Sequence, residues 1–379
     1  MKKLLILLVL FSSCAVVSPL QKSKYLTLSN LIDSGKYTEA KDVVEEMIAD
    51  KHSQKWPKTW YYKGHLCQAA YAEGTKKGNN ALTELYPNQL AEAYSAYTSA
   101  LALDKRGRLE KLVAPKIIIL ANDFQKIGEK SFNEKKYDES FSAFEHALNI
   151  IRIPALSIQV DTNLLYNTAL AAYEAKLWDK ATNYLTELHN QKHSKNVSHL
   201  LSEAYLQKTD TAMAVKVLYE GAQNFAYPDT LTLLLTDLLY KTNNTEKAHS
   251  KLDEAIGKNP NSYTLYSTKG LLYQKKNQYR KAIEYYAKAI ELNPKDHELY
   301  VSIATCFYNI GVDIEVRSLK LTNNRLVIEH KAKSAEAFED AISWLDKSSQ
   351  YGKPKPKTQA KINELYRLLG ASDKVEANS

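Results

Sequence analysis

Three histidines between residues 189 and 199 are the best candidates in this chain for binding a metal ion. His189 and His193 are four residues apart, a spacing that places two imidazoles on one face of a helix, and His199 follows. His193 falls at a predicted turn, however, and no Cys or carboxylate completes a ligand set. We therefore expect no metal site and no cofactor, and interpret these as histidines near a turn, in contact with solvent.

Catalytic chemistry has as little support. The chain contains no glycine-rich phosphate loop, no Gly-x-Ser-x-Gly turn and no His-Glu-x-x-His helix, and only 12 of its residues are Gly. Glu45 and Glu46 form a carboxylate pair, but we predict that both lie on outward helix faces, where nothing raises a carboxyl pKa for acid-base work. The expectation is a protein that is not an enzyme, with no catalytic residues.

Composition favours one helical architecture over several ordinary domains. The 379 residues are 44% hydrophobic, with few Gly and only 10 Pro, which argues against a turn-rich β-fold. The apolar residues are spread evenly, so no internal membrane span is expected. The formal charge of +8 comes mostly from Lys scattered among Glu and Asp, a pattern typical of a solvated surface. Nucleic-acid binding is therefore not expected.

The first twenty residues have the pattern of an export signal. Two lysines precede an apolar stretch, then small residues lead to Cys14. This end of the stretch resembles the lipobox of bacterial lipoproteins, although Phe11 stands where Leu is usual. The resemblance implies a lipid anchor on Cys14 and an exported, periplasmic, outer-membrane-associated protein. The alternative is an ordinary signal cut near Ala15, with Cys14 incidental.

A repeat of about 34 residues organises the rest of the chain. Its clearest unit begins at Tyr263 and carries Tyr266, Gly270, Tyr273, Tyr279, Ala282, Tyr286, Ala289 and Pro294. Tyr266, Gly270 and Tyr273 lie on one face of the first predicted helix, and Ala282, Tyr286 and Ala289 lie on one face of the second, with small residues where the two helices cross. The unit resembles the tetratricopeptide repeat, and the resemblance extends over residues 21–370.

The resemblance implies an all-α fold: a right-handed superhelical α-solenoid of about eight helix-turn-helix repeats with a C-terminal capping helix. Residues 1–20 are excluded as a signal peptide. The predicted repeats are 21–54, 57–106, 121–154, 162–194, 195–228, 229–262, 263–296 and 297–353, followed by a cap at 357–370 and a disordered tail at 371–379. Two repeats are interrupted, by inserts at 71–88 and 311–334, which we place on the turn side of the stack.

The two cysteines that remain after Cys14 lie in repeats far apart along the chain. Each repeat of a solenoid touches only its neighbours, so Cys67 and Cys306 are expected to be too distant for a disulfide. We predict two buried thiols, neither of them catalytic.

A solenoid of this family binds partners in the groove lined by its first helices. Carried over repeat by repeat, the resemblance assigns the groove to Phe132, Asn133, Asn163, Tyr166, Tyr173, Asn196, His199, Glu203, Asp237, Tyr240, Gln274, Lys275, Tyr308 and Asn309. Tyr and Asn suit a mixed peptide surface, so protein or peptide partners are expected. The alternative is an outer-membrane glycan-binding protein, which would use Trp56, Trp60 and the insert at 71–88.

Overall fold

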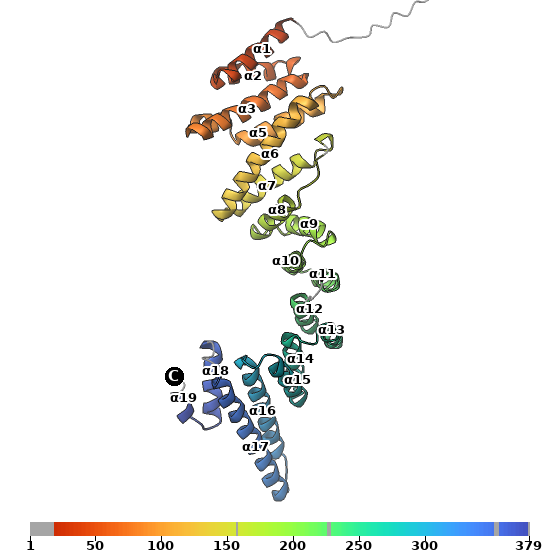
Figure 1. The fold of residues 1–379 in the computed structure, drawn as a ribbon, viewed down its shortest axis with the longest axis vertical. Helices are drawn as coiled ribbons and strands as arrows, with labels where there is room; N and C mark the ends of the chain where they lie inside the picture. Colours follow the sequence, from red (N-terminus) through yellow and green to blue (C-terminus); the bar gives the residue numbers. More distant parts are fainter. Residues whose placement is uncertain (1–18, 157, 226–228, 352–355, 378–379) are drawn as a thin grey trace, which may run out of the picture. The chain divides into compact units, whose positions relative to one another are not determined.

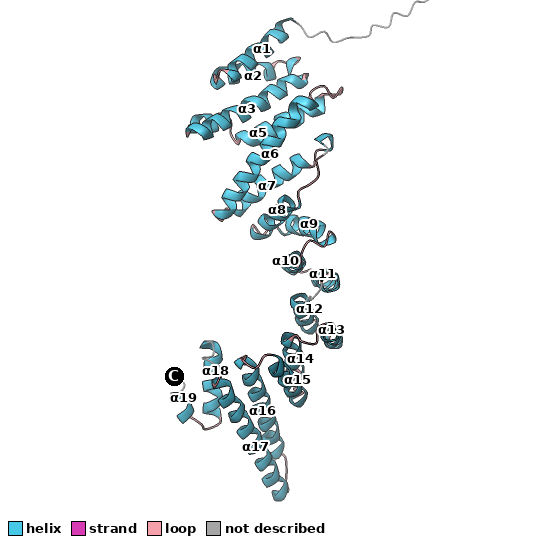
Figure 2. Ribbon diagram, viewed as in Figure 1, coloured by secondary structure: helices cyan, strands magenta, loops and turns pink. Residues whose placement is uncertain are grey.

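The computed structural model describes residues 19–156, 158–225, 229–351 and 356–377, and all regular structure in these ranges is helical (Figure 2). The chain divides into two compact units, residues 1–184 and 185–379. The first unit contains α1 (Pro19–Asp33), α2 (Tyr37–Ala49), η1 (Ser53–Lys55), α3 (Pro57–Lys77), α4 (Asn80–Thr83), α5 (Gln89–Leu103), α6 (Glu110–Asn133), α7 (Tyr137–Ile151), η2 (Pro154–Leu156), α8 (Thr162–Glu174) and part of α9 (Trp178–Asn190). The predicted signal segment lies almost wholly outside the described residues, as does Cys14.

The second unit continues with helices of 13 to 14 residues, then two longer helices, another helix of 13 residues and a short one of 5 (Figure 1). They are α10 (Lys195–Gln207), α11 (Thr211–Asn224), α12 (Asp229–Lys241), α13 (Thr245–Lys258), α14 (Tyr263–Lys275), α15 (Tyr279–Leu292), α16 (His297–Ser318), α17 (Asn324–Ser349), α18 (Pro356–Leu368) and α19 (Asp373–Ala377). The fold is thus all-α and built of successive helical hairpins, as predicted.

The turn inside each regular hairpin has one backbone signature. Thr209, Asn243 and Asn277 follow α10, α12 and α14 at equal intervals along the chain, with φ angles of 60°, 59° and 58°. A left-handed residue at this place ends a helix by bonding its orphan carbonyls, and it costs a non-glycine residue roughly 1 kcal/mol. Gly35, at φ 75°, occupies the same place after α1 without that cost. The repeat is therefore visible in the backbone as well as in the apolar pattern.

Glycine and an aromatic ring meet where the two helices of a hairpin cross. A Cβ added to Gly128 or Gly270 would lie 2.7 Å from the ring of Phe144 or 2.9 Å from that of Tyr286. The members of these pairs lie on consecutive helices joined by a short turn. In the first interrupted repeat the same contact joins Gly64 on α3 to Tyr97 on α5, although the whole insert separates them in the sequence. The crossing is therefore preserved, and the extra residues lie beyond it.

The predicted second insert, 311–334, is a continuation of the hairpin. α16 and α17 extend past the crossing as two long helices, joined by a short turn at residues 319–323. Gly311 contacts the Phe338 ring, and the hydroxyl of Ser334 donates to the Gly311 carbonyl at 3.0 Å. Residues 311 and 334, the ends of the predicted insert, therefore lie where the two helices cross. Most residues between them are helical, where a polar loop was expected.

The C-terminal helices cover the last hairpin. Ile362, Leu365 and Tyr366 of α18 pack against α16 and α17, where Val301 and Leu345 are also buried. The tail was predicted to be disordered from residue 371, but Asp373–Ala377 forms α19. Lys374 holds this short helix against Asp346 at 2.6 Å, an ion pair that the sequence pattern did not indicate.

One helix of the described residues, α16, has the length and composition of a membrane span. Its apolar side chains pack within the protein: Leu299, Ile303 and Cys306 lie in a cluster with α15, and Val301 and Ala304 lie in the cluster with α17 and α18. These contacts bury part of the apolar surface of the helix within the protein.

Candidate functional site

A small hollow opens between α6 and α8 on the side of the first helices. It has a volume of ≈ 260 Å³ and is lined by Glu129, Phe132, Asn133, Phe144, Asn167 and Leu170. We call it the inner-face hollow. Phe132 and Asn133 were predicted as groove residues, and the structure brings them together with Asn167, which the family positions did not include.

The two amides of the inner-face hollow have no side-chain hydrogen bond to any residue that the structure describes. Asn133 is exposed and Asn167 is half-buried. The Phe132 ring is half-buried and packs edge-on against Tyr137, with centroids 5.3 Å apart. The hollow therefore offers two unused amide groups beside an aromatic ring of restricted freedom. An amide carries both donor and acceptor groups, as does a peptide bond.

Other predicted groove residues contact one another in the second unit. The Lys275 ammonium lies 4.6 Å from the centre of the Tyr240 ring, which joins α14 to α12. Asp237 pairs with Lys241 at 2.6 Å, and the His199 ring lies 3.4 Å from the Glu203 carboxylate. These contacts give the face a mixed aromatic and charged character.

Three predicted groove residues contribute to packing within the protein. Gln274 accepts a hydrogen bond from the Tyr286 hydroxyl at 2.7 Å. Tyr308 lies 5.6 Å from the Phe338 ring, and Tyr173 lies 5.5 Å from Trp178. Of the remainder, Tyr166 and Asn309 are half-buried, whereas Asn163 and Asn196 are exposed.

The histidine cluster is not a set of solvent-facing turn residues, because His189 is buried at 6% exposure. Its two ring nitrogens lie 3.0 Å from the Ser198 hydroxyl and 3.2 Å from the Glu220 carboxylate. His193 is exposed at the turn, as expected. Among the described residues no group of three or more His, Cys, Asp or Glu could hold a metal ion.

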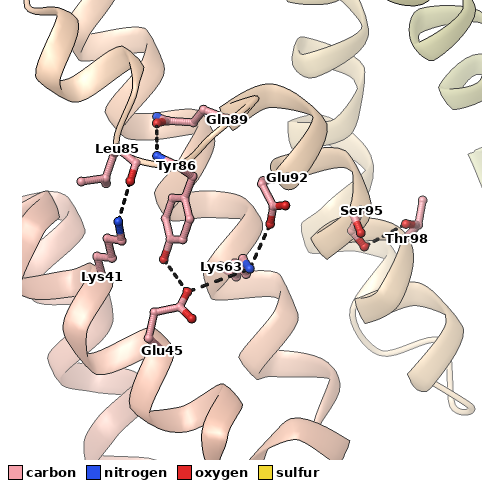
Figure 3. Close-up of polar contacts among 9 residues, drawn as sticks. All are labelled: Lys41, Glu45, Lys63, Leu85, Tyr86, Gln89, Glu92, Ser95 and Thr98. Carbon is pink, nitrogen blue, oxygen red and sulfur yellow. Dashed lines mark hydrogen bonds and ion pairs between the residues drawn. The ribbon is translucent and has the colours of Figure 1, made fainter.

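The insert between α3 and α5 is held by a polar network (Figure 3). The Tyr86 hydroxyl donates to the Glu45 carboxylate at 2.8 Å, and the Lys41 ammonium donates to the Leu85 carbonyl at 2.7 Å. Lys63 lies 3.9 Å from Glu45. The Glu45 side chain remains 45% exposed, in line with the predicted outward face, but the insert folds back against α2 and uses this carboxylate as a support.

Gln89 fastens the other end of the insert. Its side-chain oxygen accepts from the Tyr86 backbone N–H at 3.0 Å, and its nitrogen donates to the carbonyls of Cys67 and Leu82 at 2.8 and 2.9 Å. Burial, and then the bond to Glu45, raise the pKa of the Tyr86 phenol, which stays a donor at all physiological pH values. The insert is thus a fixed part of the surface.

Replacing Tyr86 by Phe tests this network. Tyr86→Phe removes the bond to Glu45 and is expected to lower the free energy of unfolding by about 1 kcal/mol. Urea denaturation followed by circular dichroism measures the loss. Tyr94→Phe is the control, because no hydrogen bond of the Tyr94 hydroxyl is found among the described residues. Equal stability of both variants would show that the insert is not held by Tyr86.

A cluster of aromatic rings on α1 and α3 was missed by the sequence analysis. Tyr25 stacks on Tyr62 with centroids 5.6 Å apart, and Tyr61 contacts both Tyr62 at 5.2 Å and the His65 ring at 6.0 Å. The adjacent tyrosines at 61 and 62, with His65 one turn later, were the available signal. Burial, and then the charge of Lys116, lower the pKa of His65 to about 4.

The lowered pKa makes stability depend on pH. An unfolded histidine titrates near 6.5, so protonation favours the unfolded chain as the pH falls from about 6.5 to about 4. Between pH 7.5 and 4.5 this titration is expected to lower the free energy of unfolding by about 2 kcal/mol in the natural protein. His65→Gln should abolish that decrease, and urea denaturation at the two pH values would measure it. His52→Gln, at an exposed position, should leave the pH dependence unchanged. An unchanged dependence in His65→Gln would contradict a neutral buried imidazole.

Both described cysteines are buried, as predicted. Burial raises the pKa of the Cys67 thiol to about 12, so the thiolate that nucleophilic chemistry requires is not populated at neutral pH. This agrees with the prediction that Cys67 is a packing residue.

Comparison with known proteins supports the repeat assignment in part of the chain. Residues 263–296, which contain α14 and α15, match the model of the family described as tetratricopeptide repeat. Over 97 residues the chain is 36% identical to tetratricopeptide repeat protein 21A of Homo sapiens, a match that covers 25% of this chain and 7% of that protein. The protein is thus an all-α array of helical hairpins that includes a recognisable tetratricopeptide repeat.

Several solved structures share local similarity with the chain. The MamA protein is 15% identical, with 62% of this chain and 97% of that chain covered and a TM-score of 0.33. A thermophilic tetratricopeptide repeat protein of Thermus thermophilus is 23% identical, covering 49% and 98%, with a TM-score of 0.31. YrrB, described as a protein with an unusual peptide-binding site, is 14% identical, covering 48% and 87%, with a TM-score of 0.34.

Proposed function

We propose that this protein is a non-enzymatic scaffold that binds an extended segment of a protein partner on its inner face. The observation that carries the proposal is the inner-face hollow, where the amides of Asn133 and Asn167 have no partner among the described residues. An extended peptide leaves its backbone N–H and C=O groups unpaired, and amide side chains can bond both.

The walls of the hollow suit the side chains of such a segment. Phe132 and Leu170 offer apolar surface in its lining, and Glu129 adds one negative charge. A volume of ≈ 260 Å³ is too small for a typical small-molecule site, which occupies about 300–1,000 Å³ and encloses its ligand. One or two side chains of a peptide that continues along the neighbouring helices fit this space better.

Selection from a displayed library of linear peptides tests the proposal. We expect recovery of peptides whose dissociation constants, measured by fluorescence anisotropy, rise when the inner-face amides are removed. Recovery of peptides that bind Asn133→Ala/Asn167→Ala as well as the natural sequence would contradict the inner face as the binding surface. Failure to recover any peptide, together with binding of soluble oligosaccharides, would favour the glycan-binding alternative.

The location of the scaffold is a separate proposal, supported by the sequence of residues 1–20 alone. We infer export to the periplasm and attachment to the outer membrane through a lipid on Cys14. Mass spectrometry of the mature protein from native membranes would find a diacylated N-terminal Cys14. An unmodified N-terminus beyond Cys14 would contradict attachment by lipid.

A further inference from the structure

The insert also forms one wall of a second and larger hollow, on the side of the second helices. It measures ≈ 1030 Å³ and lies over α6, between the insert and α7. We call it the insert hollow. Its walls include Tyr71 of α3, Glu84 and Pro87 of the insert, Phe124 and Ile127 of α6, and Asp138, Glu139 and His146 of α7. The proposed inner-face function makes no use of this surface.

The walls of the insert hollow are aromatic and well supported. His146 stacks on Phe124 with ring centroids 4.8 Å apart and packs edge-on against Tyr94 at 5.6 Å. Tyr71 is half-buried on the opposite helix. Because the bonds of Tyr86 and Gln89 fasten the insert, the hollow is a preformed feature. Phe124 is buried and His146 stacks on it, so the half-buried rings of Tyr71 and His146 offer the accessible aromatic surface of the hollow. The face of a tyrosine ring attracts cations through its quadrupole.

The charges at the insert hollow have one sign. Glu84, Asp138 and Glu139 line it, and no Lys or Arg does so within the part of the chain that the structure describes. Lys136 lies close enough to Glu139 to interact with it, but pairs with Glu134 at 2.8 Å. The negative charge at the hollow is thus opposite in sign to the formal charge of +8 on the whole chain. The residues that line the hollow carry only negative charge, and the ammonium groups of Lys41 and Lys63 lie 4.6 and 5.2 Å from the centre of the Tyr86 ring in its wall.

We propose that the insert hollow binds a basic segment of a protein partner, with an Arg or Lys side chain against the aromatic wall and apolar neighbours on Ile127 and Pro87. The volume and the apolar walls suit a peptide segment, whereas the three carboxylates select its charge. The site is distinct from the inner face and stands independently of it.

Binding of defined peptides tests this site. The probe is a fluorescein-labelled nonapeptide of alternating Arg and Leu, compared with its Glu and Leu counterpart. We expect the basic peptide to bind, with affinity that falls as salt increases, and the acidic peptide not to bind. Asp138→Asn/Glu139→Gln should weaken binding about tenfold. The matched control, Glu339→Gln/Asp340→Asn on α17, removes the same charges from exposed positions and should change nothing.

A second variant separates binding from helix stability, because Asp138 and Glu139 also lie in the first turn of α7, where carboxylates favour the helix dipole. Tyr71→Leu keeps apolar volume but removes the aromatic face. It should lower the affinity for the basic peptide several-fold and leave the circular dichroism spectrum unchanged. Asn133→Ala/Asn167→Ala should bind this peptide normally, so failure at one surface does not imply failure at the other.

Three results would overturn the proposal. One is an equal loss of affinity in the α17 control, which would show nonspecific attraction. Another is salt-independent binding of chitohexaose that Tyr71→Leu abolishes while the charge variants do not, which would indicate a sugar site. The third is a concentration-dependent dimer, by analytical ultracentrifugation, that Asp138→Asn/Glu139→Gln dissociates, which would assign the surface to a second copy of this chain.

Discussion

Asn133→Ala/Asn167→Ala is expected to lower the affinity for an inner-face peptide about thirtyfold. With one hydrogen bond from each amide to the peptide backbone, and about 1 kcal/mol net for each bond, losing both bonds costs about 2 kcal/mol. Neither amide bonds to the rest of the described protein, so the free energy of unfolding should change by less than about 0.5 kcal/mol. Fluorescence anisotropy and urea denaturation measure the two quantities.

The matched control is Asn122→Ala/Asn149→Ala, which removes two exposed amides from α6 and α7 outside the inner-face hollow. We expect it to bind the same peptide with unchanged affinity. A large loss of stability in the Asn133 and Asn167 variant would show that these amides serve the fold. Equal affinity in both double variants would place the peptide elsewhere.

Gly64→Ala should destabilise the first unit by about 2 kcal/mol. Its new Cβ would lie 2.7 Å from the Tyr97 ring, which is fully buried and donates a hydrogen bond to Gln68 at 3.0 Å. The ring cannot move without breaking that bond, so overpacking outweighs the roughly 1 kcal/mol that Ala gains over Gly in a helix. The midpoint of urea denaturation measures the effect.

A glycine-to-alanine substitution is expected to raise the free energy of unfolding where the added Cβ has free space. No side chain or other contact lies within 4 Å of a Cβ added to Gly257 on α13, so Gly257→Ala should stabilise the protein by about 0.5–1 kcal/mol. A neutral or stabilising Gly64→Ala would contradict the close crossing of α3 and α5. It would then remove the basis for placing the insert beyond that crossing.

The regular hairpins could be predicted from the sequence because each position of the repeat has one physical demand. Gly270 and Ala282 are small where helices cross, and Tyr286 fills the space beside Gly270. Each such requirement for a residue type recurs once in every repeat, so it can be recognised in the amino-acid sequence alone. The inner-face positions follow from the same register, which is why Phe132 and Asn133 could be predicted to lie there.

The interrupted hairpins could not be predicted in the same way, because a contact between distant residues has no period. Gly311 and Phe338 lie much further apart in the sequence than Gly270 and Tyr286, and only the structure shows that both pairs make the same contact. The bond from Tyr86 to Glu45 likewise joins two residues from different repeats, so the sequence pattern did not show that this surface carboxylate supports the insert. That bond is one of those that hold the insert, which forms one wall of the insert hollow.

Photo-crosslinking from the inner face tests the central claim most directly. Benzoylphenylalanine would replace Phe132 in the native host, and, as the comparison, Ile328, which is 69% exposed on α17. We predict one reproducible protein adduct from position 132, none from position 328, and loss of the adduct when Asn167→Ala is added. The same adduct from both positions, or an adduct that persists in Asn167→Ala, would contradict binding of a partner segment on the inner face.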